Sequence, residues 1–199
     1  MAIWTLFVTA SWRTDMKMFN KNFLWYALYY GVAYHLPETR GNGWIGLLSG
    51  KLRYLCVRHI IKKCGKHVNI HRHAFFGTGK NIELGDYSDM GKDCHIPNNV
   101  RIGNNVMMGP KCFILPQDTH DISNLNIPMN MQGRVIKPGC TVIGNDVWIG
   151  REVMITGGGY TIGNHSVIGA RSVVAKNVPD WAIVAGNPIR VIRFRNQNQ

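Results

Sequence analysis

One short segment of the chain combines the residue types that acid–base catalysis needs. Residues 117–121 read Q-D-T-H-D, which places His120 between two carboxylates. A neutral imidazole can take a proton near pH 7, and a positioned base of this kind accelerates a reaction by roughly 10²–10⁴. Asp118, Asp121 or a backbone carbonyl could orient the ring. We therefore predict that His120 is a general base; the simpler alternative is that it only caps its loop.

The other histidines and the cysteines show no spacing typical of a metal site. Neither a C-x-x-C motif nor a Cys/His ligand pattern is present, so no metal is expected. The five cysteines are expected to be free thiols, which is typical of a reducing compartment such as the cytoplasm. We favour a solvated position for the seven histidines other than His120: His35, His59, His67, His71, His73, His95 and His165. His71 and His73 alternate along one predicted strand, so contact of these two with a ligand is the alternative.

Apolar residues recur every six positions through most of the chain. Two residues before each of these anchors lies a second and often small residue, such as Ala74, Cys94 or Ser172, and glycine follows nine of the fourteen anchors. This period fits neither an α-helix nor a single strand, and it is typical of a parallel β-helix of short strands that meet at corners. The anchors are Ile70, Phe76, Leu84, Met90, Ile96, Ile102, Met108, Ile114, Ile143, Ile149, Ile155, Ile162, Ile168 and Val174.

Interruptions of the repeat indicate where loops leave the coil. The largest one, residues 115–139, carries His120. Two extra residues lie between Phe76 and Leu84, and one lies within 156–161. Because neighbouring turns of a stacked coil cannot shift, the large insertion must project as a loop, where functional groups usually lie. The predicted fold is mainly β, in three parts: a helical cap over residues 1–66, the β-helix over 67–178, and a basic tail over 179–199.

The first 66 residues are rich in aromatic and basic side chains. Residues 22–36 are predicted to form one helix, which is too short to span a bilayer. No basic residue precedes the N-terminal apolar stretch, so no secretory signal is expected. A second helix is indicated by spacings of three and four between Leu52, Leu55, Cys56 and Ile60. The basic residues of this segment then lie on its other faces: Arg53, Arg58, Lys62 and Lys63.

The formal charge of +12 suggests an anionic partner. Much of it lies in residues 51–66 and in the tail residues Arg190, Arg193 and Arg195. The motifs of nucleic-acid-binding modules are absent, so we expect no nucleic acid. Phosphates of a cofactor, or a peripheral contact of residues 22–66 with anionic lipid, would account for the charge equally well. A solvated basic surface without a partner is the alternative for the N-terminal cluster.

The hexads, the loop with its histidine and the closing sequence together resemble the hexapeptide-repeat acyltransferases, in particular the maltose, galactoside and capsule-sugar O-acetyltransferases. The similarity covers residues 64–195 and is most specific in VIGNDVWIG (142–150) and IGNHSVIGARSVVAKNVPDWAIVAGNPIRVIR (162–193). The N-terminal region looks like the helical cap of bacterial polysaccharide-biosynthesis acetyltransferases. The resemblance implies a left-handed β-helix, a homotrimer with each active site between two subunits, and acetyl-CoA as co-substrate.

The same resemblance suggests further site residues. Asp89 matches the position of an Asn that holds the acceptor hydroxyl in the sugar enzymes, although a solvated corner residue is an equal alternative. The chain departs from the family pattern at Ala175, which replaces a Thr, and at GGGY (157–160), which replaces a PGV corner and leaves Tyr160 unexplained. The implied acetyl-CoA contacts are Trp148, Gly150, Arg151, Ala170, Ala175, Lys176, Arg190 and Arg193.

These observations predict an acetyl-CoA-dependent O-acetyltransferase that acts on a hydroxyl of a sugar or polysaccharide precursor, in the cytoplasm or at the inner face of the membrane. Two alternatives are an N-acetyltransferase of an amino or nucleotide sugar and a non-catalytic β-helix scaffold. A metal hydratase of the γ-carbonic anhydrase kind shares the hexad but needs three histidine ligands, and positions 115 and 125 are leucines. No motif identifies the acceptor.

Overall fold

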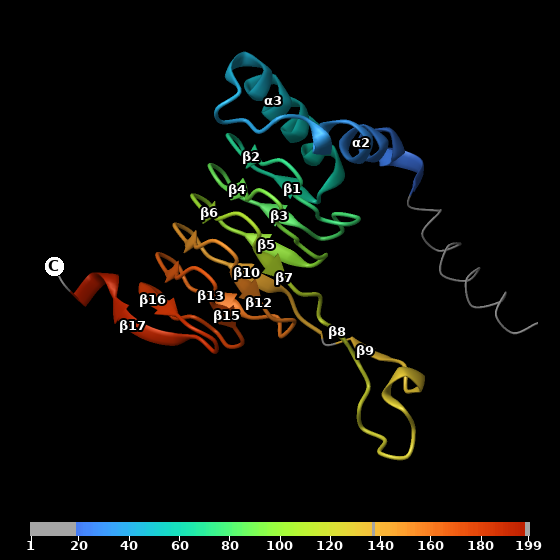
Figure 1. Cartoon of the computed structure of the whole chain (residues 1–199), viewed down its shortest axis with the longest axis vertical. Helices are drawn as coiled ribbons and strands as arrows, with labels where there is room; N and C mark the ends of the chain where they lie inside the picture. Colours follow the sequence, from blue (N-terminus) through green and yellow to red (C-terminus); the bar gives the residue numbers. More distant parts are fainter. Residues whose placement is uncertain (1–18, 137, 198–199) are drawn as a thin grey trace, which may run out of the picture.

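The computed structural model describes residues 19–136 and 138–197. Two helices lie at one end of a coil of short strands, and a hairpin projects from the coil (Figure 1). The helices are α2 (Phe19–Gly31) and α3 (Gly43–Ile60), with the 3-10 helix η1 (Ala33–His35) between them. Within the described ranges, no helix has the length and hydropathy needed to cross a bilayer. Residues 1–18 of the predicted cap lie outside those ranges.

The coil has three faces, each built from strands of successive turns. The first face contains five parallel strands: β1 (Lys63–Cys64), β3 (Glu83–Leu84), β5 (Val100–Ile102), β10 (Thr141–Ile143) and β13 (Thr161–Ile162). The second contains β2 (Asn69–Ile70), β4 (Asp89–Met90), β6 (Met107–Met108), β11 (Trp148–Ile149), β14 (Val167–Ile168), β16 (Ala182–Ala185) and the antiparallel β17 (Arg190–Phe194), which η3 (Arg195–Gln197) follows. The third contains β7 (Phe113–Ile114), β12 (Met154–Ile155) and β15 (Val173–Val174).

The pairing registers show how many residues each turn takes. Partners in β3 and β5 are eighteen residues apart, which is three hexads. The separation is twenty between β2 and β4, nineteen between β11 and β14, and forty-one between β6 and β11. The longer turns confirm the two small interruptions and the large one. The large insertion forms the antiparallel hairpin of β8 (Asp118–His120) and β9 (Arg134–Ile136), with η2 (Met129–Met131) between them.

The hexad is confirmed as the pattern of the core, because all fourteen anchors are buried. The corner between two strands requires one residue in the left-handed backbone conformation, three positions before the anchor. Asp93, Asn99 and Lys111 are examples, with φ of 54°, 61° and 57°. Such angles are uncommon outside glycine. Their recurrence at this position shows that the corners of the stacked coil impose them.

Glycine after an anchor allows successive turns to approach closely. A Cβ atom on Gly85 would lie 2.4 Å from the carbonyl oxygen of Gly103, and one on Gly103 would lie 2.6 Å from that of Gly144. Both obstacles are backbone atoms of a hydrogen-bonded turn, which cannot move aside. The glycines that follow the anchors are therefore required by the spacing between turns.

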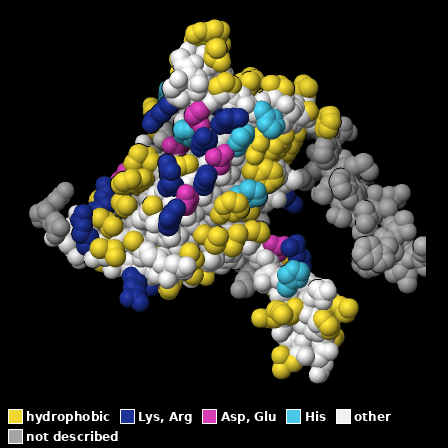
Figure 2. Space-filling model, viewed as in Figure 1, with side chains coloured by type: hydrophobic (Ala, Val, Ile, Leu, Met, Phe, Trp, Pro, Cys, Tyr) yellow, Lys and Arg dark blue, Asp and Glu magenta, His cyan; other side chains and the backbone are white. Residues whose placement is uncertain are grey.

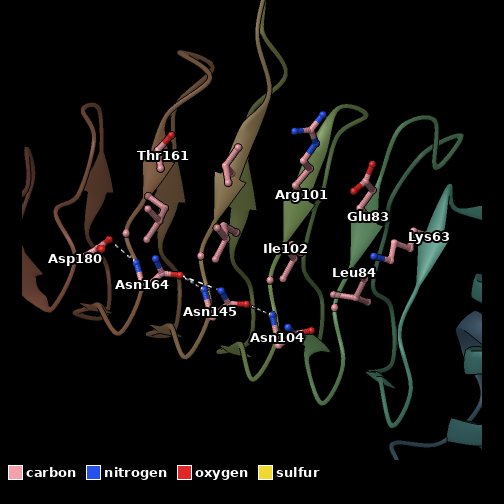
Figure 3. Close-up of a pocket in the computed structure, with 17 residues that line it drawn as sticks. Lys63, Glu83, Leu84, Arg101, Ile102, Asn104, Asn145, Thr161, Asn164 and Asp180 are labelled. Carbon is pink, nitrogen blue, oxygen red and sulfur yellow. Dashed lines mark hydrogen bonds between the residues drawn. The ribbon is translucent and has the colours of Figure 1, made fainter.

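Asparagine side chains connect the turns along one corner (Figure 3). Oδ1 of Asn145 accepts the backbone N–H of Asn104 at 2.9 Å, and Oδ1 of Asn164 accepts that of Asn145 at 2.8 Å. Asp180 continues the series by accepting the N–H of Asn164 at 2.8 Å. Each side chain satisfies a backbone donor that the parallel sheets leave unpaired, so this ladder stabilises the first face.

The predicted buried face of α3 is confirmed at Cys56 and Ile60 and wrong at two other positions. Leu55 is exposed, whereas Arg53 is fully buried. The Arg53 guanidinium donates to the carbonyl oxygens of Ile70 and Pro37 at 2.7 and 3.1 Å, and to Oγ1 of Thr39 at 3.0 Å. The spacing of apolar residues alone placed the basic residues on the solvent side of the helix. Arg53 is buried instead, because these acceptor oxygens on the inner side satisfy its guanidinium.

The coil extends slightly beyond the predicted residues 67–178 at both ends. Strand β1 already pairs with β3, and β16 adds a strand beside β14 before β17 folds back on it. Tyr160 does not enter the core: its half-buried ring lies against Gly158, where a Cβ atom would meet the ring at 2.2 Å. The GGGY corner therefore accommodates the large side chain by folding it back over a glycine.

Candidate active site

The second face of the coil carries the polar and aromatic residues predicted to bind substrates. Asp89 on β4, Met107 on β6 and Trp148 on β11 occupy the same position, one residue before the anchor, on successive turns. The N–H of Asp89 donates to the carbonyl oxygen of Val106 at 3.0 Å, which places β4 beside β6. Half of the Trp148 side chain is exposed. The structure thus brings Asp89 and Trp148 to one flat surface, two turns apart.

Asp89 is held in a defined orientation. Its Oδ1 accepts the backbone N–H of Met108 at 2.5 Å, and its Oδ2 lies 3.8 Å from Nε2 of His71. Three quarters of the side chain is shielded from solvent. The Asp89 carboxylate is therefore partly shielded and held by its neighbours rather than fully solvated.

The sequence analysis missed the pair formed by His71 and Glu38. Nδ1 of His71 lies 3.0 Å from Oε1 of Glu38, and its Nε2 lies 2.8 Å from Nδ2 of Asn69. An Nδ1–H that donates to Glu38, with Nε2 accepting from Asn69, satisfies both contacts. Glu38 also accepts the backbone N–H groups of Thr39 and Arg72 at 2.8 and 3.2 Å. The loop that follows α2 therefore supports the site through a histidine that spacing suggested was solvated.

Charge and burial act in opposite directions on this pair. Burial lowers the pKa of His71, but the nearby carboxylates of Asp89 and Glu38 outweigh it and hold that pKa above its ordinary value. Burial raises the pKa of Glu38, and the donors of Thr39, His71 and Arg72 reverse this, so its pKa is lowered overall. The pair therefore favours a charged carboxylate beside an imidazole that is easily protonated. Glu38 is the only Asp or Glu between residues 16 and 82, a signal that could have drawn attention to it.

His120 lies on the projecting hairpin, away from this surface of the same chain (Figure 1). It is exposed and pairs with Arg134 across the β8–β9 ladder. The flanking carboxylates have other partners: Asp118 forms an ion pair with Arg134 at 2.7 Å, and Asp121 accepts the N–H of Ser123 at 2.9 Å. Neither one orients the His120 ring here.

Only some of the residues predicted to contact the coenzyme lie near one another. Gly150 and Ala170 stack at one corner, where a Cβ atom on Gly150 would meet the Ala170 nitrogen at 2.6 Å. The N–H of Gly150 donates to Ile168 at 2.8 Å, whereas that of Arg151 has no hydrogen-bond partner within residues 19–136 and 138–197. The remaining predicted contacts are exposed at two other places, after β15 and on β17: Ala175, Lys176, Arg190 and Arg193.

Several of the other histidines are held by neighbouring rings rather than by water alone. His95 stacks between Phe75 and Phe113, with ring centroids 4.3 and 4.9 Å apart, and burial lowers its pKa. His165 stacks on Trp181 at 4.0 Å. These rings support the outside of the coil. No group of three or more His, Cys, Asp or Glu residues able to hold a metal ion occurs among the residues that the structure describes.

A groove also runs along the first face of the coil (Figure 3). Lys63, Glu83, Arg101 and Thr161 project outward there from β1, β3, β5 and β13. None of the predicted catalytic or coenzyme residues lines it. The second face, and not this groove, is therefore the candidate site.

Known proteins with similar sequences are acetyltransferases, and they include enzymes named for sugars, for polysaccharide biosynthesis and for chloramphenicol. Galactoside O-acetyltransferase of Escherichia coli K12 is 33% identical over 142 residues, which is 70% of this chain and 67% of that protein. The chain belongs to the hexapeptide-repeat acyltransferases. The putative colanic acid biosynthesis acetyltransferase WcaF of E. coli K12 is 28% identical over 78% of this chain and 82% of its own. No protein-family model matches.

Two solved structures of this family show the same architecture. A maltose O-acetyltransferase from Clostridium difficile 630 superimposes with a TM-score of 0.65 over 87% of this chain and 86% of its own, at 28% identity. A Vibrio cholerae hexapeptide-repeat acetyltransferase, VCA0836, solved with acetyl-CoA, gives 0.52 over 71% and 75% at 28% identity. The chain is therefore an acyltransferase, and its mainly β coil is the family fold.

Proposed function

We propose that this acyltransferase moves an acetyl group from acetyl-CoA to a hydroxyl of a sugar or polysaccharide precursor. The observation that carries the proposal is the arrangement of the second face, where Asp89 and Trp148 share one surface while the hairpin presents His120 outward. The galactoside and colanic acid relatives support a carbohydrate acceptor.

In the proposed reaction, His120 removes the proton from the acceptor hydroxyl as its oxygen attacks the thioester carbonyl. The oxyanion that develops needs a donor, and the unpaired N–H of Arg151 is suited to this role. Collapse of the tetrahedral intermediate breaks the carbon–sulfur bond. The thiolate of coenzyme A then takes the proton from His120, which restores the neutral base. Asp89 accepts a hydrogen bond from the acceptor and fixes its orientation.

A second subunit would complete this site. The hairpin carries the exposed apolar side chains Ile122, Leu125, Met131 and Ile136, which a single chain leaves in water. Burial against the second face of a neighbour would cover them and bring His120 to Asp89 of another copy. We accordingly propose the homotrimer of left-handed coils that the family resemblance implies.

The side chains of the second face also suit acetyl-CoA. The exposed ring of Trp148 offers a flat apolar surface for the pantetheine arm, beside the Gly150–Arg151 segment and Ala170. Exposed cations at Lys176, Arg190 and Arg193 suit the phosphates, because a guanidinium donates two parallel hydrogen bonds. Ala175 contributes only backbone contact at this end.

An amine acceptor remains the second candidate. Asp89 is a carboxylate where the sugar enzymes are expected to carry an amide, and a carboxylate attracts an ammonium group before the proton is removed.

All five cysteines are free, which supports a reducing compartment and hence the proposed cytoplasmic location.

The proposal is tested by supplying acetyl-CoA with a panel of sugars, amino sugars and nucleotide sugars and following free thiol and product mass. We expect His120→Ala to lower turnover by about 10²–10⁴ while the affinity for coenzyme A changes less than twofold. An Asp121→Asn variant, which changes the neighbouring residue, is the control and should keep most activity. Full turnover by His120→Ala would place the base elsewhere, and no thioester consumption with any acceptor would favour the scaffold alternative.

A further inference from the structure

An ordinary surface helix buries its large apolar residues and exposes its polar ones. The first half of helix α3 does the opposite. In the first half of α3 the buried residues are small or polar, namely Gly46, Ser49, Gly50 and Arg53, whereas its last turns bury Cys56, Val57 and Ile60. A Cβ atom on Gly46 would lie 2.6 Å from the carbonyl oxygen of Glu38, and one on Gly50 would lie 2.8 Å from Oγ1 of Thr39. The loop that follows α2 thus packs so closely against the first half of α3 that large apolar residues cannot face inward there.

The opposite face of α3 is apolar and exposed. Trp44, Leu47, Leu48 and Leu55 have 71%, 58%, 55% and 40% of their surface in water. Their spacings of three, four and seven place them on one stripe of the helix. We call this surface the α3 outer face; it consists of Trp44, Leu47, Leu48, Lys51, Leu55 and Arg58. Figure 2 shows hydrophobic side chains gathered at the end of the molecule where α3 lies.

Only cations interrupt this apolar stripe. Lys51 and Arg58 are exposed within it, and the chain has no Asp or Glu from residue 39 to residue 82. A second copy of the chain on this face would bring two sets of cations together, because a two-fold contact places like residues opposite one another. An anionic surface, by contrast, complements both the charge and the apolar side chains.

A groove leads from the α3 outer face toward the candidate active site. Its lining includes Leu47 and Lys51 of that face together with Lys66, His67 and Asn69. Asn69 donates to His71, which lies beside Asp89. The groove therefore offers cations along a path between the exposed leucines and the residues proposed to hold the acceptor.

We infer that the α3 outer face docks on a membrane that contains anionic lipids, with the apolar side chains among the acyl chains and Lys51 and Arg58 at the phosphates. The helix lies in the plane of the interface, and the β-helix stands away from the membrane at its far side. Docking places the groove at the level of the lipid headgroups. Lys62, which pairs with Glu83 at 2.7 Å, and the buried Arg53 take no part.

The inference is tested by co-sedimentation of the full chain with vesicles of phosphatidylcholine alone and of phosphatidylcholine with about one third phosphatidylglycerol. We expect at least tenfold tighter binding to the anionic vesicles, weakened when salt rises from 0.1 to 0.5 M because exposed charges are then screened. The double variants Leu47→Gln/Leu48→Gln and Lys51→Glu/Arg58→Glu should each lower binding at least tenfold. All four side chains point outward, so the fold should persist, which thermal unfolding checks.

Matched controls carry the same changes elsewhere on the surface. Ile192→Gln replaces an exposed apolar residue of β17, and Lys92→Glu/Lys111→Glu makes the same change of charge as the α3 variant. Both should bind vesicles as the wild type does. Equal binding by the α3 variants and the controls would overturn the inference. The inference would also be overturned if the wild type did not bind vesicles and the Leu47→Gln/Leu48→Gln variant had a smaller assembly mass. The α3 outer face would then be a contact between copies of the chain.

This inference stands apart from the proposed reaction. Acetyl transfer to a water-soluble acceptor should be unchanged in Lys51→Glu/Arg58→Glu, since neither residue touches the candidate site. Loss of vesicle binding with intact transfer supports docking alone, whereas loss of transfer in His120→Ala with intact vesicle binding concerns chemistry alone.

Discussion

Replacing Arg53 should separate the helical cap from the coil. The guanidinium is fully buried and has five hydrogen-bond acceptors around it, of which the nearest, at 2.7 Å, is the carbonyl oxygen of Ile70. The other acceptors are Ala33, Leu36 and Pro37, through their carbonyl oxygens, and Oγ1 of Thr39. One side chain thus joins α3 to η1, to the following loop and to the first turn of the β-helix.

Arg53→Met keeps most of the aliphatic stem and removes every donor. A hydrogen bond from a charged group contributes about 1.5–3 kcal/mol net, and a buried acceptor that loses its donor costs about 1–3 kcal/mol. The bonds share one group and do not add fully, so we expect the free energy of unfolding to fall by about 3–5 kcal/mol, as when one partner of a buried ionic contact is removed.

Urea unfolding at a fixed protein concentration measures the change, because subunit association would otherwise alter the midpoint. With a slope of about 2–3 kcal/mol per molar urea, the midpoint should fall by roughly 1–2 M. The exposed Arg58→Met serves as control and should shift unfolding by less than about 0.5 kcal/mol. Amide exchange should also quicken at Arg72, whose N–H donates to Glu38. A shift for Arg53→Met no larger than the control's would refute this account of the cap.

Two further predictions concern the coil and the site. Gly103→Ala places a methyl group against the backbone of the next turn and should lower the free energy of unfolding in urea by about 2 kcal/mol or more. Gly31→Ala, where a Cβ atom has no neighbour within 4 Å, is the control and should lower it by less than about 1 kcal/mol. Equal losses in the two variants would disprove the close-approach argument. The folded pKa of His71 is raised, so its contribution to stability is complete below the ordinary value of about 6.5 and is lost as pH rises through the higher folded pKa. Unfolding measured from pH 5 to 9 should therefore show falling stability above about pH 6.5 that His71→Asn or Glu38→Gln removes, and an unchanged pH profile would show that the pair is not formed.

Docking of the cap on a membrane would give the appended helices a purpose beyond covering the first turn. The end of a β-helix exposes unpaired strand edges that must be covered, and α3 does this with small and polar residues in its first half and with Cys56, Val57 and Ile60 in its last turns. The large apolar residues Trp44, Leu47, Leu48 and Leu55 remain outside, where they add nothing to the stability of the isolated chain. This arrangement explains why the spacing of apolar residues correctly placed Cys56 and Ile60 in the interior but wrongly placed Leu55 there.

The residues around Asp89 show where inference from sequence stops. Similarity of the repeat was enough to align Asp89 with the position at which the family resemblance implies an Asn that holds the acceptor. It was silent on Glu38 and His71, which lie thirty-three residues apart in the chain and meet through one hydrogen bond. A charged residue in a loop has no periodic pattern to indicate its partner, and a histidine on an outward position usually faces water.

The architecture of the coil was determined by sequence alone, because each hexad repeats the same local demands: an anchor inward, a small residue before it, and often a glycine where turns approach. A departure from the pattern in one place can be recognised because the hexads on either side are regular. The insertion that carries His120 could therefore also be located. Only the tertiary structure decided that Arg53 faces inward while Trp44 and Leu55 face out, and that Glu38 reaches His71 beside Asp89. These outcomes depend on how a loop packs between a helix and the first turn, where steric fit and available hydrogen-bond acceptors override the ordinary preference of each residue type.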